Sequence, residues 1–296
     1  MNNGPQYLFN RKWLVAIGQQ GQPGNAYDKL RVVFDIDKNL FSSPNKSKIG
    51  VYNLTLTQRR GISIANPATG QLGDIVRLDA GYQDLVETLY IGDIARAKSE
   101  RKGADIITTF ECGDSEKQLI YSHFEQSYPP GTTLVRIITD CAKALGVNIG
   151  TILGVPTKTY NSGVSFSGSV KGTLDKILAF QALEWSVQNG TLNIIPTTAH
   201  LGTEAVLISK ETGMIGVPSQ GEEFLQFTSL LNPKLVPGAL VFLETQTVNG
   251  SFKIRRSHFE GDSHGQKWQV ECEATPIFAA QSLPANRGLT FGSAVA

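Results

Sequence analysis

The chain has 296 residues, enough for two or three domains, and folding of such a chain buries roughly three quarters of its extended surface. Apolar residues make up 41% and charged residues 18%, a balance typical of a globular protein and not of a disordered one. The 27 basic and 26 acidic side chains leave a net charge of +1, which argues against avid binding to duplex nucleic acid through counterion release.

The cysteines and the hydropathy pattern bear on where the chain folds. Cys112, Cys141 and Cys272 are odd in number and far apart, as is typical of a protein that folds in a reducing cytoplasm, and we expect three small buried side chains. The sequence begins without a basic end followed by an apolar core, so it predicts no signal peptide. The longest uncharged apolar stretch, residues 144–156, is too short to cross a bilayer, so we expect no stable membrane insertion.

The first section of the chain, residues 1–127, has the pattern of short β-strands. Apolar and polar residues alternate in residues 52–57 and 76–80, as expected where one face of a strand points into a core. Residues 30–36 and 106–112 are short apolar runs that contain β-branched side chains. Several short strands at this spacing favour a barrel or a sandwich over a parallel sheet.

The pattern changes at residues 128–131, where Tyr-Pro-Pro-Gly cannot continue a strand and predicts a domain boundary. Thr132 or Thr133 is a suitable N-cap for an amphipathic helix that ends at Gly146. A short strand follows at residues 164–166. We therefore expect the all-β pattern to be interrupted here.

A second helix is expected after this strand, capped near Thr173 and with an apolar stripe that runs on to Trp185. The pair Asn189-Gly190 then lies between two alternating segments, which is the strongest short signal for a β-hairpin. Residues 128–202 are thus predicted to form a small α/β module.

Strand patterns return in residues 203–280. A second Asn-Gly pair, Asn249-Gly250, lies between apolar segments and predicts another hairpin turn. Residues 268–273 alternate once more, and the predicted second β domain ends near residue 280. The last segment, residues 281–296, is small, polar and glycine-containing, and we expect it to be a flexible C-terminal arm.

The two β sections show a weak internal repeat. Residues 73–78 resemble residues 238–243, and each segment begins with a glycine. Residues 89–91 then correspond to 252–254, Ile106 to Trp268, and Glu111-Cys112 to Glu271-Cys272. Alternating strands can resemble one another by chance, and duplication with the α/β module between the copies is the interpretation we adopt.

No catalytic motif is present: there is no phosphate-binding GxxxxGK segment, no HExxH or CxxC pair and no GxSxG elbow. One segment places four residues that could bind a metal close together, namely His258, Glu260, Asp262 and His264. Short loops rarely bring three ligands together, so the ordinary interpretation is a solvated turn. We therefore predict no catalytic residue, no cofactor and no metal, with these four residues as the candidates for a metal site.

Two groups of motifs resemble the phage baseplate hub family. An asparagine-containing segment followed by a glycine-led strand that ends in Gly-Tyr resembles the first barrel of these proteins. A Leu-Asn-Pro segment and a His-x-x-Gly-Asp-x-x-Gly-x-x-Trp pattern resemble the second. The matching positions in this sequence are Asn45, Tyr52, Gly73, Gly81, Tyr82, Asn232, Pro233, Gly238, His258, Asp262 and Trp268.

The resemblance covers most of residues 30–275 and implies a fold and a role. The implied fold is mainly β, with two tail-tube-like β-barrels and an inserted small α/β module. The implied protein is a non-enzymatic hub subunit in the virion tail baseplate, assembled in the host bacterial cytoplasm as a homotrimer. It would join the sixfold tail tube protein to the threefold central spike protein and leave a channel for the tape-measure protein and for DNA in transit.

Two other classes of function remain open at this stage. A tail-associated cell-wall hydrolase or carbohydrate-binding protein would need a cleft lined by convergent acidic side chains. A binder of single-stranded nucleic acid would use a barrel groove with aromatic side chains and basic residues.

Overall fold

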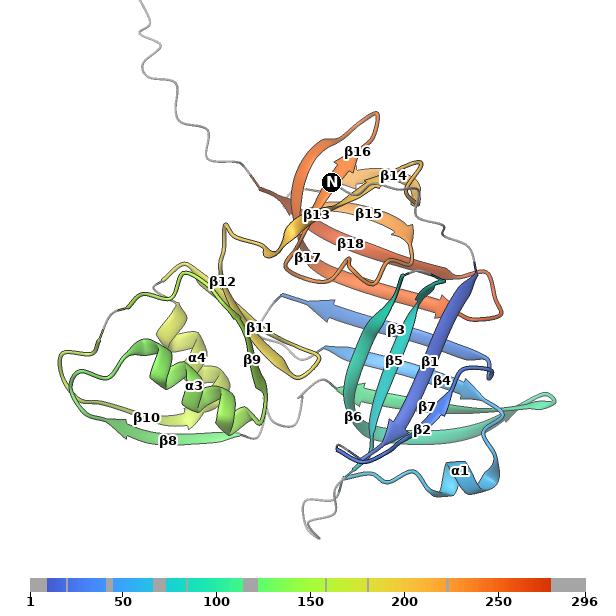
Figure 1. Cartoon of the computed structure of the whole chain (residues 1–296), viewed down its shortest axis with the longest axis horizontal. Coiled ribbons are helices and arrows are strands. Elements are labelled where there is room, and N and C mark those ends of the chain that lie inside the picture. Colours follow the sequence, from blue (N-terminus) through green and yellow to red (C-terminus); the bar gives the residue numbers. More distant parts are fainter. Residues whose placement is uncertain are drawn as a thin grey trace, which may run out of the picture.

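The computed structural model describes residues 10–19, 21–40, 45–65, 73–83, 85–113, 122–157, 159–179, 181–221 and 224–277. β-strands predominate, and the described residues form a first β half, an inserted α/β module and a second β half (Figure 1). The predicted mainly β class with an inserted α/β module is confirmed. The expected C-terminal arm, residues 281–296, lies outside the described residues.

The first β half contains seven strands and one short helix. Their bounds are β1 Arg11–Gly18, β2 Asn25–Tyr27, β3 Val32–Asn39, β4 Lys46–Tyr52, α1 Leu56–Arg60, β5 Ile75–Tyr82, β6 Leu85–Lys102 and β7 Asp105–Gly113. The strands pair in the order β3-β4-β7-β6-β5-β1-β2, and every pair is antiparallel. The connection between β6 and β7 is a short turn at residues 103–104.

The second β half contains six strands. Their bounds are β13 Leu201–Ser209, β14 Met214–Gln220, β15 Leu225–Leu230, β16 Ala239–Glu244, β17 Asn249–Asp262 and β18 Trp268–Pro276. These strands pair in the order β14-β15-β18-β17-β16-β13. If β3 to β7 are matched in sequence with β14 to β18, and β1 with β13, the two halves have the same strand order. One detail differs: β13 runs parallel to β16, whereas β1 runs antiparallel to β5.

The two halves are not separate closed barrels in the described part of the chain. β17 pairs with β3, so the strands of both halves join into a single 13-stranded sheet. The sheet folds over itself, and side chains from both halves share one hydrophobic core that includes Val15, Ile49, Leu78, Phe259 and Trp268. The expected barrels are therefore open, because the edge of the first half is used to bind the second.

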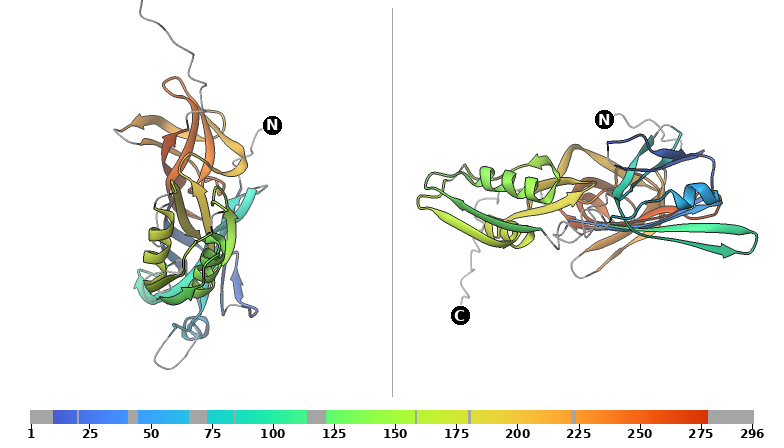
Figure 2. Two further views of the ribbon diagram at one scale, coloured as in Figure 1. Left: turned by 90° about the vertical axis from the view of Figure 1, so that its left-hand side faces the viewer. Right: turned by 90° about the horizontal axis from the view of Figure 1, so that it is seen from below.

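The inserted module has a core of its own. Its elements are β8 His123–Tyr128, α3 Leu134–Leu145, β9 Asn148–Ile152, β10 Val164–Ser169, α4 Val170–Leu178, β11 Leu183–Gln188 and β12 Thr191–Pro196. β8 pairs with β10, and β9 lies beside the hairpin of β11 and β12. Both helices pack on these sheets, and the module lies to one side of the β body (Figures 1 and 2).

Local signals predicted much of the module. Thr133 caps α3 through a hydrogen bond from the Arg136 backbone, and Gly146 ends it with a left-handed φ of 68°. The predicted hairpin is also confirmed, with Asn189 and Gly190 both at positive φ between β11 and β12. The expected boundary at residues 127/128 falls at the end of β8, whose partner β10 belongs to the module.

Several local predictions are wrong. Residues 52–57 are not one strand, because Thr55 and Gln58 form a capping box that starts α1. The second helix starts at Val170 instead of near Thr173, because Ser169 caps it. It ends at Leu178, so the expected stripe through Trp185 is divided between α4 and β11.

The Asn249-Gly250 pair is not a turn. Both residues lie in β17, opposite Glu244 and Leu243, and the loop is residues 245–248. The hydroxyl group of Thr245 bonds the backbone of Val248 in both directions, which closes this loop without glycine.

The three cysteines are free and buried, as expected, and burial raises the pKa of each thiol to about 12. Among the described residues, no helix has the length and apolar character that crossing a membrane requires.

Candidate assembly interface

The two β halves meet along a seam where β17 pairs antiparallel with β3. Residues 256–262 lie opposite residues 33–39, with Phe259 facing Ile36 and Gly261 facing Phe34. Phe259 is fully buried. A Cβ atom on Gly261 would lie 2.1 Å from the Phe34 ring, so the glycine leaves the space that this ring occupies. The seam is therefore a packed sheet interface within one chain.

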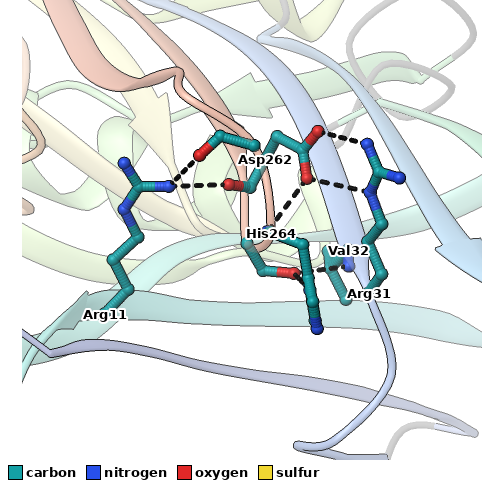
Figure 3. A network of polar contacts seen from close by, with 7 residues as sticks. Arg11, Arg31, Val32, Asp262 and His264 are labelled. Atoms are coloured by element: carbon teal, nitrogen blue, oxygen red, sulfur yellow. Dashed lines mark hydrogen bonds and ion pairs between the residues drawn. The ribbon is translucent and has the colours of Figure 1, made fainter.

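A polar network locks one end of the seam (Figure 3). Arg31, at the start of β3, donates two hydrogen bonds to the Asp262 carboxylate, at 2.6 and 3.1 Å. The backbone N–H of His264 also donates to this carboxylate, and the Ser263 hydroxyl group accepts from the N–H of Val32. The bond from Arg31 is the main cause that lowers the pKa of Asp262 below its ordinary value.

The same loop is held from the opposite side by β1. Arg11 donates to the backbone carbonyls of Asp262, Gly265 and Gln266 (Figure 3 shows Arg11 beside this loop). Its guanidinium also lies 5.4 Å from the centre of the Trp268 ring, which packs edge to face against Phe34. Charged and aromatic groups thus join strands that are about 250 residues apart in sequence.

A buried ion cluster attaches the inserted module to the second β half. Glu184 of β11 accepts hydrogen bonds from Lys253 and Arg255 of β17, and the bond from Arg255 measures 2.5 Å. Lys253 is 1% exposed and also donates to the carbonyls of Pro196 and Thr197. Burial lowers the pKa of Lys253, and Glu184 opposes that shift. A charge buried in this way destabilises the folded protein when its oppositely charged partner is removed.

A second attachment involves Asn45, one of the family-motif positions. Its side chain accepts from the backbone N–H of Asn39 and donates to the carbonyl of Val187 and to Gln188. Gln188 returns a bond to the carbonyl of Asn39. The motif asparagine thus ties the β3–β4 connection to the module hairpin.

The remaining motif positions lie in or beside the strands of the two β halves. Tyr52 lies under the Arg31 guanidinium, 4.6 Å from ring centre to carbon, and Tyr82 is buried in the core. Gly81 leaves room for the Leu85 carbonyl, and a Cβ atom on Gly73 would lie 2.5 Å from the Ala65 nitrogen. In the second half the motif positions are the buried Asn232, which accepts from the Lys234 backbone, the buried Pro233, and Gly238 with a φ of +87°.

The structure does not bring the four predicted metal-ligand residues together. Asp262 is held by Arg31, and Glu260 binds Lys267 at 2.6 Å. His264 contacts the Ser263 hydroxyl group at 2.9 Å. The four residues are therefore engaged in separate contacts, and the segment is mostly the end of β17 where a solvated turn was expected.

His258 instead faces two carboxylates of β3. Its Nδ1 atom lies 3.1 Å from Asp37 and 3.9 Å from Asp35, and one ligand atom from each residue falls within 4.8 Å of the others. Arg256 already pairs with Asp37 at 3.0 Å. Sequence reasoning missed the two aspartates, whose only local signal is their spacing on one face of a strand.

The two halves also repeat a β-bulge. In the first half Ile94 lies opposite Cys112 and Arg96 opposite Glu111, which leaves Ala95 without a partner. Arg96 and Glu111 are 3.9 Å apart.

In the second half Ile254 lies opposite Ala274 and Arg256 opposite Glu273, so Arg255 is the extra residue of the bulge. Arg256 and Glu273 are 3.8 Å apart. The residues of β17 therefore correspond to those of β6 plus 160 (255 − 95).

This correspondence corrects the repeat that the sequence suggested. Residues 73–78 do correspond to 238–243, and Ile106 to Trp268. Residues 89–91 correspond to 249–251 and not to 252–254, and Glu111 corresponds to Glu273 and not to Glu271. The loops between strands differ in length, so a comparison of short sequence motifs lost the register.

Comparisons with known proteins agree with this fold. The chain has a TM-score of 0.62 to the 43 kDa tail protein of prophage MuSo2 from Shewanella oneidensis, at 10% identity, covering 90% of this chain and 98% of that one. A tail protein from Neisseria meningitidis also gives 0.62, at 11% identity, with 90% and 97% covered. An E. coli protein described as a component of the type VI secretion system gives 0.59, at 10% identity, with 89% and 77% covered.

A search of curated protein sequences finds no significant match. The model of the family described as baseplate hub gp41 matches residues 15–274. That span contains the seam, the inserted module and all eleven motif positions. The chain belongs to the baseplate hub gp41 family.

Proposed function

We propose that this chain is a structural hub subunit that forms a homotrimeric ring and adapts the sixfold tail tube to the threefold central spike. The observation that carries the proposal is the repeated strand order of the two β halves within one chain. Three chains then supply six similar β halves around one axis, while the assembly keeps the threefold symmetry of a spike. The family supports a structural role in a phage tail baseplate.

The proposed partners are those that the family resemblance implies. One face of the ring would bind the tail tube protein, the opposite face would bind the central spike protein, and the channel would pass the tape-measure protein and then DNA. A net charge of +1 suits such a channel, because a strongly basic bore would retain phosphates. Three free, buried cysteines suit assembly in the reducing host cytoplasm.

The eleven motif positions are proposed as structural residues, with no catalytic group or cofactor among them. Asn45 and the Arg31–Asp262 pair carry this assignment most directly, because they hold the module and the two halves together. The alternative of a wall hydrolase is not favoured, since Glu260 and Asp262 at the open hollow over the seam are each paired with a cation.

The proposal is tested by the mass of the purified chain in solution and by imaging of tail particles. We expect a species three times the chain mass, and density for a ring between tube and spike. A monomer at all concentrations that is also absent from tail particles would contradict the proposal. Clearing of purified peptidoglycan by the protein would instead support the hydrolase.

A further inference from the structure

The outer half of β6, residues 95–102, has an unpaired edge. Over this length β6 pairs only with β7, and within the described ranges no strand pairs with its other side. The hairpin of β6 and β7 projects away from the rest of the molecule (Figures 1 and 2, green). A row of free backbone N–H and C=O groups on a projecting strand is a template for pairing with another chain.

The counterpart of this segment is already paired inside the molecule. The outer half of β17, residues 255–262, leaves β16 at the bulge and pairs with β3 instead. In the repeat, the counterpart of β3, the strand that pairs with β17, is β14. β14 lies at one end of the sheet, and β6 of the same chain does not pair with it.

β14 has a matching free edge. It lies at the end of the sheet and pairs only with β15 in the part of the chain that the structure describes. It also carries two exposed aliphatic side chains, Ile215 at 40% and Val217 at 71% exposure. An edge strand with exposed aliphatic residues is prone to pair with a further strand.

We propose that the outer half of β6 pairs antiparallel with β14 of a second copy of this chain, and that this contact closes the ring. The inference rests on the proposed homotrimer and names the surfaces that form it. The seam between β17 and β3 then occurs three times within chains and the contact between β6 and β14 three times between chains. Every edge of this kind is thereby paired, as a closed ring requires.

The pairing of β17 with β3 also predicts the register of the proposed contact between β6 and β14. Glu260 lies opposite Asp35, and its counterpart in β6 is Glu100 (260 − 160). The remaining step is to find the counterpart of Asp35 in β14.

Asp35 pairs with Lys48, which lies opposite Glu111. Ser219 pairs with Gln226, which lies opposite Glu273, the counterpart of Glu111. Ser219 is therefore the counterpart of Asp35, and Glu100 should lie opposite Ser219 of the neighbouring copy.

A designed disulfide tests this register on the full-length chain. In the double variant Glu100→Cys/Ser219→Cys, directly opposite positions bring the two thiols to bridging distance. The matched control is Ser99→Cys/Ser219→Cys, because residue 99 points to the other face of the strand. The natural cysteines compete little, since burial keeps them protonated with a pKa of about 12.

The expected result after mild oxidation is a shift of the main band on a non-reducing gel from chain mass to three times that mass. The shift should be reversed by reductant and absent from the control and from both single variants. Light scattering on the same samples separates the two levels of the proposal. A trimer by light scattering without the covalent shift would overturn this contact and keep the trimer.

A monomer by light scattering without a crosslink would overturn both the contact and the proposed ring. A covalent ladder that extends beyond three chains would support the strand pairing but overturn ring closure. Equal crosslinking in the control would overturn the register, and with it the assignment of these two edges.

Discussion

The outer halves of β17 and β6 are counterparts with the same bulge and the same cross-strand arginine–glutamate pair, yet their surroundings differ. In β17 one face is buried through Ser257, Phe259 and Gly261, because β3 completes the sheet beside it. In β6 the corresponding residues are half-buried or exposed, and they are Ala97, Ser99 and Arg101.

This difference shows that the two β halves can diverge in their surface residues and still keep the same fold. The copy that finds its partner strand in the same chain has an apolar residue at the contact. The copy without such a partner has polar residues there, Ser99 and Arg101, as is typical of an exposed strand edge. Each of the following substitutions has a substitution in β6 as its control.

The largest effect is expected for Phe259→Ala. Truncation of a fully buried phenylalanine removes packing at the seam and leaves a cavity, and should lower the free energy of unfolding by about 3–5 kcal/mol. Its counterpart Ser99 is exposed, so Ser99→Ala should change stability by less than about 0.5 kcal/mol. Urea titration followed by tryptophan fluorescence measures both, and equal losses would mean that the two outer halves do not differ in packing.

A loss of about 3 kcal/mol is expected for Glu184→Ala, which leaves Lys253 buried without its carboxylate. The positions that correspond to Lys253 and Arg255 in the first half are Asp93 and Ala95, so only the second half carries this clamp for the module.

The control for this substitution is Glu100→Ala, which breaks an exposed pair with Lys98 and should cost less than about 1 kcal/mol. Proteolysis of the module at low protease concentration should also accelerate in Glu184→Ala only. Unchanged stability in this variant would mean that the cluster does not hold the module.

The sequence predicted those features that depend on residues close to one another. The N-cap at Thr133, the helix end at Gly146 and the Asn189-Gly190 turn each depend on residues that are a few positions apart. All three are confirmed. The repeat could be found at residues 73–78 because this strand pairs with the next one without a register shift from Ile75 to Leu78 and from Leu240 to Leu243.

The seam could not be predicted in this way. Arg31 and Asp262 are 231 residues apart, and neither residue has a local signal that names the other. Glu111 was matched to Glu271 because a cysteine follows each of them, although the strand pairing places its counterpart two residues later, at Glu273. Pairing between distant strands is decided by the whole sheet and not by a short window.

The smallest effect is expected for Asp262→Asn, at the locked end of the seam. Arg31 holds the pKa of Asp262 below its ordinary value of 3.8, so the folded state favours the carboxylate. The stabilisation is complete above that ordinary value and is lost as the pH falls through the lowered one. The variant should therefore be less stable by about 1 kcal/mol at pH 7, and the difference should shrink below about pH 4. The counterpart Lys102 is exposed on the free hairpin, so Lys102→Gln should leave the stability of the monomer unchanged at every pH. Urea titrations of the three proteins at several pH values measure this, and a difference that persists at pH 2 would show that the Arg31 bond is not its cause.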